Sequence, residues 1–96
     1  MVNSIDTTIF APAPFCVSRF HKETNCVELV SIGPKMQVYS IDGVCAFVWR
    51  QLDGETSLGQ IVNRTVKEFE VSTARAKKDI EAFIDELLQL DLILER

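Results

Sequence analysis

The chain has 96 residues, of which 47% are hydrophobic and 25% are charged, and its formal net charge is −4. This length and composition predict one folded domain rather than a disordered chain. The acidic balance disfavours a nucleic-acid partner, because such proteins need a basic excess to release counterions from phosphates. No apolar run reaches the roughly 20 residues of a membrane-spanning helix, and no secretory signal pattern is evident, so we expect a cytoplasmic protein that binds no membrane.

The cysteines Cys16, Cys26 and Cys45 form no CxxC pair, and the chain has one histidine, His21. This set cannot build a tetrahedral zinc site without carboxylates or a second chain. We therefore expect reduced thiols, with Cys45 packed as a small apolar side chain, and no bound metal or cofactor. His21 is expected at the surface, and no residues match a catalytic motif, so the sequence predicts no enzyme activity.

The first fourteen residues contain Pro12 and Pro14, and we interpret them as an extended arm rather than a packed element, followed by a domain over residues 15–96. Three β-rich runs then predict a three-stranded antiparallel meander. Alternation of apolar and polar residues is imperfect in the first two runs, so their facing stays open. The runs are residues 15–21, 26–32 and 36–39, with turns at residues 22–25 and at Gly33-Pro34-Lys35.

From Asp42 onward the apolar residues recur at i, i+3, i+4 and i+7, which is typical of helices that pack on one side. Asp42, Ser57 and Ser72 are expected to cap three helices, and Ser57 forms a capping box with Gln60. Asp53-Gly54 is expected to close the first helix, because glycine readily adopts the left-handed conformation of a helix end. The apolar face of the first helix is Ile41, Val44, Cys45, Val48, Trp49 and Leu52, that of the second is Leu58, Ile61, Val62, Val66 and Phe69, and that of the third is Ala76, Ile80, Phe83, Ile84, Leu87 and Leu88. A short closing strand is expected at residues 92–94.

Residues 38–54 combine a short strand carrying Tyr39, the cap Ile41-Asp42, the pair Val48-Trp49 and the tripeptide Leu52-Asp53-Gly54. This ordered set resembles the central signature of the PqqD family, and the resemblance extends over residues 15–94. Two positions depart from the family pattern, which often has an acidic residue at Gly59 and glycine at Cys45. Gly59 is expected to weaken the start of the second helix by up to about 1 kcal/mol relative to alanine.

The resemblance implies a winged-helix-turn-helix-like α+β fold, with a three-stranded antiparallel sheet followed by three helices. It implies that the leader of a ribosomally made precursor peptide adds a strand in the groove between the third strand and the third helix. The protein, a monomer or dimer, would present this leader to a partner such as a radical-SAM enzyme or a leader peptidase. The peptide-binding residues implied in this way are Met36, Gln37, Val38, Tyr39, Arg75, Lys78, Asp79 and Phe83.

An edge strand offers unpaired main-chain groups to an extended peptide, which fits this role independently of the resemblance. Phe83 is nevertheless expected in the core first, Tyr39 and Met36 could pack under the helices, and Arg75 and Lys78 could be plain surface charges rather than contacts to an acidic leader. Two other functions stay open. A winged-helix DNA-binding protein would show salt-dependent retention on DNA, and a structural accessory subunit would bind the enzyme tightly without leader affinity.

Overall fold

The computed structural model describes residues 5–32 and 36–96, so the predicted turn at Gly33-Pro34-Lys35 lies outside the described residues. The predicted α+β fold is confirmed. None of the helices in the described ranges combines the length and hydrophobicity needed to cross a membrane. The elements are η1 (Ile5–Thr7), β1 (Phe10–Pro12), β2 (Cys16–His21), β3 (Cys26–Ser31), β4 (Gln37–Ile41), α1 (Gly43–Trp49), α2 (Leu58–Phe69), α3 (Thr73–Gln89) and β5 (Ile93–Glu95).

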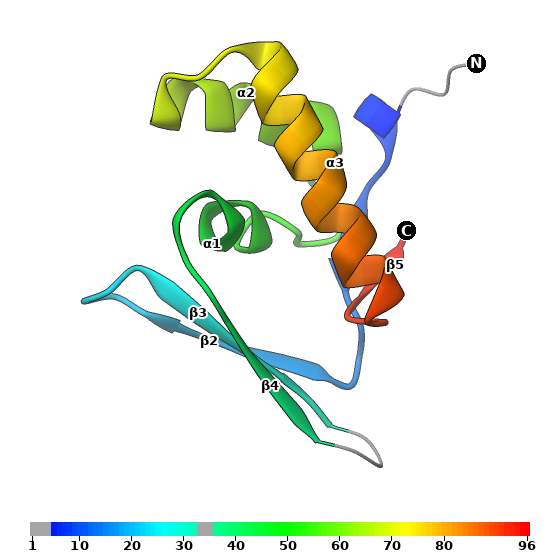
Figure 1. Cartoon of the computed structure of the whole chain (residues 1–96). Coiled ribbons are helices and arrows are strands. Elements are labelled where there is room, and N and C mark those ends of the chain that lie inside the picture. Colours follow the sequence, from blue (N-terminus) through cyan, green and yellow to red (C-terminus); the bar gives the residue numbers. More distant parts are fainter. Residues whose placement is uncertain (1–4, 33–35) are drawn as a thin grey trace.

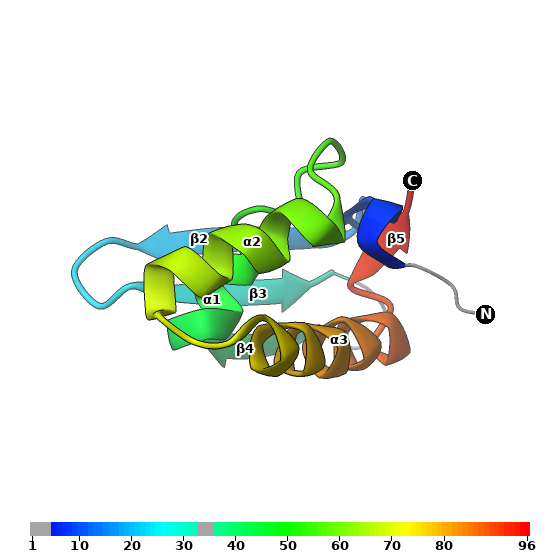
Figure 2. The same cartoon turned by 90° about the horizontal axis from the view of Figure 1, so that it is seen from above.

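The domain has two layers, with the helices on one face of an antiparallel sheet whose strand order is β2-β3-β4 (Figure 1). Seen from above, α3 lies on the β4 side of the sheet and α2 on the β2 side (Figure 2). The core fills the space between the layers and includes Trp49, as its apolar spacing predicts. Because β2 and β4 are the outer strands of this sheet, each has one edge that the sheet itself leaves unpaired.

The strand register settles the facing that the sequence left open. Val27 and Leu29 of β3 are each only 1% exposed and therefore point toward the helices. Side chains alternate across a strand, so Val30 points to the opposite face, which no described element covers. Val30 pairs with Val17 of β2 and Val38 of β4, which are 50% and 62% exposed.

The same register determines which main-chain groups face the open edges. The amide of Ile32 donates to the carbonyl of Phe15 at 2.9 Å, which marks residues 15 and 32 as a hydrogen-bonded antiparallel pair. Such pairs alternate, so β3 bonds β2 through every second residue and β4 through the residues between them. The main-chain N–H and C=O groups left at the edges are those of Ser18 and Phe20 in β2 and of Val38 and Ser40 in β4.

The amino-terminal segment packs against the domain, which corrects the expectation of an unpacked arm. β1 pairs antiparallel with β5, and the amide of Ala13 donates to the carbonyl of Leu92 at 2.9 Å. Phe10 is only 5% exposed and belongs to the core. Pro12 does not prevent pairing, because proline is compatible with a short peripheral strand. The packing of this segment also explains why residue 59 is glycine. A Cβ atom at that position would lie 3.0 Å from the carbonyl oxygen of Asp6.

The end of the first helix was predicted too late. α1 ends at Trp49, and Asp53-Gly54 lies in the following loop rather than closing the helix. The Asp53 carboxylate accepts hydrogen bonds from the amides of Glu55 and Thr56, both at 2.9 Å, and these bonds lower its pKa. Gly54 has φ of +81° in this turn. Leu52 is buried although it is not helical, which is why helical spacing extended the prediction past Trp49.

The caps of the two longer helices are confirmed. The Ser57 hydroxyl accepts from the Gln60 amide at 3.3 Å, and the Gln60 side-chain oxygen accepts from the Ser57 amide at 3.0 Å, which completes the capping box. The Ser72 hydroxyl accepts from the Arg75 amide at 3.1 Å. Asp42 occupies the cap position of α1, but its side chain makes no capping hydrogen bond.

This difference predicts unequal costs for removing the three cap side chains. Ser57→Ala and Ser72→Ala should each lower the free energy of unfolding by about 1 kcal/mol, because each leaves a helix-end amide without its partner. Asp42→Ala is the matched control and should cost clearly less. Urea unfolding followed by circular dichroism measures all three. An equal loss for Asp42→Ala would contradict the observed capping pattern.

Candidate functional site

A groove of about 420 Å³ lies between β4 and α3. β4 contributes one wall, and the carboxyl-terminal half of α3 contributes the other. The buried side chains of Leu29 and Leu92 belong to its apolar lining. The complete lining is Leu29, Val38, Tyr39, Ser40, Ile41, Cys45, Phe83, Glu86, Leu87, Leu90 and Leu92.

The β4 wall offers main-chain hydrogen-bonding groups beside an apolar surface. Val38 and Ser40 present their N–H and C=O groups to the open edge, while their side chains point to the outer face of the sheet. Tyr39 and Ile41 direct their side chains toward the helices, and the Tyr39 hydroxyl donates to the Gln37 side-chain oxygen. This wall can therefore pair with an extended chain whatever the side chain at residue 38.

The α3 wall follows from helical spacing. Phe83, Glu86, Leu87 and Leu90 recur at i, i+3, i+4 and i+7, so they lie along one side of the helix end. Phe83 and Leu87 are buried, whereas Glu86 and Leu90 are exposed at the rim. The groove is thus apolar at its base with one carboxylate at its border.

The Cys45 thiol, which lines the groove, lies near negatively charged side chains. The pKa of the Cys45 thiol is raised, first by burial and then by the carboxylates of Glu86, Asp42 and Asp79. Near neutral pH this thiol is protonated and behaves as a small apolar group, as expected for Cys45. The electrostatic environment therefore favours neutral or basic side chains in a bound ligand.

Three of the eight predicted peptide-binding residues line the groove, namely Val38, Tyr39 and Phe83. Met36 is 68% exposed and Gln37 is also exposed, and both precede the lined part of β4. The other three, Arg75, Lys78 and Asp79, lie toward the amino terminus of α3 and outside the lining. Arg75 there forms an exposed ion pair with Asp79 at 3.3 Å. Their roles in binding stay predictions.

Sequence reasoning missed most of the lining. The sequence places Ile41, Cys45 and Leu87 on apolar helix faces alone, and it indicates no binding role for Glu86. The spacing from Phe83 to Leu90 was a usable signal, because it continues the helix stripe to its carboxyl end. The role of Ser40 depends on strand register and has no signal in the sequence itself.

The described residues contain no group of three or more His, Cys, Asp or Glu side chains placed to hold a metal ion. His21 is half-buried, and its Nε2 atom lies 2.9 Å from the Glu28 carboxylate. Both residues point to the outer face of the sheet, away from the groove. Histidine therefore contributes nothing to the groove.

These features define a small winged-helix-like domain with a sheet edge open beside an apolar groove. The family model described as coenzyme PQQ synthesis protein D (PqqD) matches residues 28–93, and the chain belongs to this family. No curated protein matches the sequence. A solved structure of TbiB1 in complex with the TbiA(beta) leader peptide is similar in fold, with a TM-score of 0.78 and 19% identity over 86% of this chain and 93% of that chain.

The carboxylates around Cys45 predict a change in thiol reactivity. Glu86→Gln removes a charge that raises the Cys45 pKa, so the thiolate fraction and the rate of alkylation at about pH 8 should rise roughly twofold. Glu81→Gln is the control, because Glu81 lies on α3 but outside this groove. Iodoacetamide labelling with peptide mass spectrometry measures the rate at Cys45. Equal rates in the two variants would contradict the proposed environment.

Proposed function

We propose that this protein is a cytoplasmic, non-catalytic peptide-binding protein that captures the leader of a ribosomally made precursor peptide and presents it to a modifying enzyme. The observation that carries the proposal is the open edge of β4, where Val38 and Ser40 present main-chain groups beside an apolar groove. Membership of the PqqD family supports it. The fold likeness to a protein solved with its leader peptide is consistent with it.

The leader binds as an added strand. Main-chain hydrogen bonds to Val38 and Ser40 supply affinity for an extended peptide, and alternate side chains of that peptide select among sequences. Side chains that point toward α3 enter the apolar groove beside Phe83 and Leu87. Binding also covers an edge that would otherwise be open to another strand.

The charge preferred in a leader side chain differs between the two ends of α3. Next to Glu86 the groove favours neutral or basic side chains, because the Glu86 carboxylate lies at its exposed rim. Toward the amino terminus of α3, Lys78 can pair with an acidic leader residue. Arg75 can do so only if that residue displaces Asp79, which already contacts Arg75 at 3.3 Å.

The partner enzyme in this proposal is a radical-SAM protein or a leader peptidase, as the family resemblance implies. The surface charges of α3 fit DNA poorly, because phosphate contacts need available cations. Arg75 is paired with Asp79 at 3.3 Å, and Lys77 is paired with Asp6 at 3.5 Å. We therefore propose peptide binding rather than DNA binding for this helix.

Proline at Val38 tests strand addition. Val38→Pro removes a main-chain donor at the open edge but no hydrogen bond within the sheet, so the domain should fold while leader affinity falls roughly three- to tenfold. Val38→Ala is the matched control and should retain affinity, because it keeps the donor and its side chain faces away. Gln37→Pro should instead destabilise the sheet, because the Gln37 amide faces β3. Calorimetry with a synthetic precursor leader peptide measures affinity.

Backbone NMR of the same titration locates the leader. Shifts should concentrate in residues 36–41 and in α3 from Phe83 to Leu90. Equal affinities of Val38→Pro and Val38→Ala, or shifts centred on the hairpin of β2 and β3, would refute the proposed binding mode.

Charge reversal at the other end of α3 tests the predicted cations. Arg75→Glu combined with Lys78→Glu should weaken the binding of an acidic leader by up to about 1 kcal/mol for each exposed ion pair that is lost, with a smaller effect at high salt. Arg64→Glu on α2 is the control, because Arg64 lies outside the groove and contacts Gln51. If the double variant binds the leader like the control, these two residues are surface charges without a binding role.

A further inference from the structure

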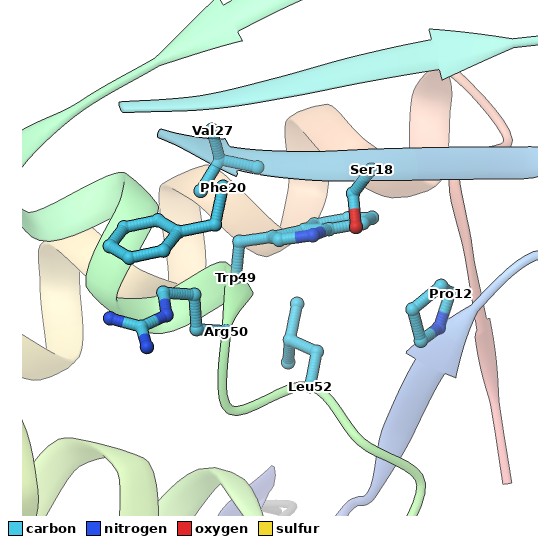
Figure 3. A pocket seen from close by; sticks show the side chains of 7 residues that line it. All are labelled: Pro12, Ser18, Phe20, Val27, Trp49, Arg50 and Leu52. Carbon is cyan, nitrogen blue, oxygen red and sulfur yellow. The ribbon is translucent and has the colours of Figure 1, made fainter. Parts of the chain in front are cut away.

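The sheet has a second open edge, at β2, with a separate cavity beneath it. This cavity of about 260 Å³ is lined by residues of β2, the outer strand opposite β4 (Figure 3). Its walls come from β1, β2, β3, the end of α1 and the loop that follows. The lining is Pro12, Ser18, Phe20, Val27, Trp49, Arg50 and Leu52.

The edge and the cavity share the same two residues. Ser18 and Phe20 direct their main-chain N–H and C=O groups to the open edge, and their side chains line the cavity. The amide of Cys16, the next residue of this set, already donates to the carbonyl of Ala13 at 2.9 Å. The open stretch of β2 is therefore the stretch directly over the cavity.

The cavity presents hydrogen-bond donors that lack partners. Trp49 is only 4% exposed, yet its indole N–H makes no hydrogen bond with any described residue. No fully buried side-chain nitrogen or oxygen in the described chain lacks a partner, so this N–H must reach solvent, and Trp49 borders solvent at the cavity. Figure 3 shows the Ser18 hydroxyl directed toward the Trp49 ring.

Arg50 adds a positive charge at one end of the cavity. Its guanidinium lies over the Phe20 ring, 3.9 Å from the ring centre, which holds the cation beside the open edge (Figure 3). No carboxylate lines the cavity, and the Ser18 oxygen is its one side-chain acceptor. A ligand group that only accepts hydrogen bonds and carries negative charge, a carboxylate, matches this set.

We propose that the β2 edge is a second strand-addition site, which takes an extended acidic segment of a partner protein. The segment pairs with the main chain of Ser18 and Phe20. A carboxylate of the segment enters the cavity, where it accepts hydrogen bonds from the Trp49 indole and the Ser18 hydroxyl beside Arg50. The two edges thus differ in charge preference, because the carboxylate of Glu86 lines the β4 groove and no carboxylate lines the cavity at β2. The proposal does not depend on leader binding at β4.

The single tryptophan of the chain makes a direct test possible, because one indole signal in a ¹H–¹⁵N spectrum reports on this cavity. The probes are the capped peptide acetyl-Thr-Val-Glu-Val-Thr-amide and its neutral analogue with Gln in place of Glu. The Glu peptide should shift the Trp49 indole signal and the amide signals of Ser18 and Phe20. The amide signals of Val38 and Ser40 should stay unchanged. The Gln peptide should bind roughly fivefold more weakly, since it lacks the charge.

Two variants that each remove one positive charge distinguish binding in the cavity from general electrostatic attraction to the protein. Arg50→Met keeps an apolar stem over Phe20 and should abolish the preference for Glu over Gln. Arg19→Met removes the same charge from the opposite face of β2 and should leave the preference for Glu over Gln unchanged. An unmoved indole signal, equal affinity for both peptides, or equal effects of the two variants would overturn the proposal. Shifts at β4 alone would also overturn it and leave the leader site standing.

Discussion

The pairing of β3 with both of its neighbours is the constraint on which the rest of the structure depends. Val27 and Leu29 bury their side chains under the helices, and this fixes which face of the sheet is internal. Hydrogen bonding to β2 through every second residue then leaves the intervening residues for β4. The main-chain groups that remain at the two edges are therefore a consequence of β3 and not of the edge side chains.

The two edges differ in what lies beside them. Beside β4, α3 supplies apolar side chains, and carboxylates raise the pKa of Cys45. Beside β2, the end of α1 supplies an indole N–H and a guanidinium. Main-chain pairing by itself discriminates poorly among sequences, so the side chains next to each edge must provide selectivity. The helices thereby give chemically different surroundings to two strands of one sheet.

The termini close the domain at one end of the sheet. β1 and β5 form a separate two-stranded ribbon, and Phe10 from this ribbon joins the core (Figure 1). Pro12 of the same ribbon lines the cavity beside β2. The segment first interpreted as an arm is therefore part of both the core and a candidate binding site. This is why removing it is expected to affect more than a flexible extension would.

Local chemistry in the sequence determined the elements, because caps and apolar spacing act within a few residues. The capping box at Ser57, the cap at Ser72 and the change of period after β4 correctly predict where the helices begin, and the PqqD resemblance is confirmed over residues 28–93. Tertiary structure decided what depends on contacts between distant residues. It packed Phe10 into the core, left Leu52 buried beyond the end of α1, and selected Ser40 and Ser18 as edge residues. The partner strand determines which alternate residues of an edge strand direct their main-chain groups to the open side, and no pattern within the edge strand itself indicates them.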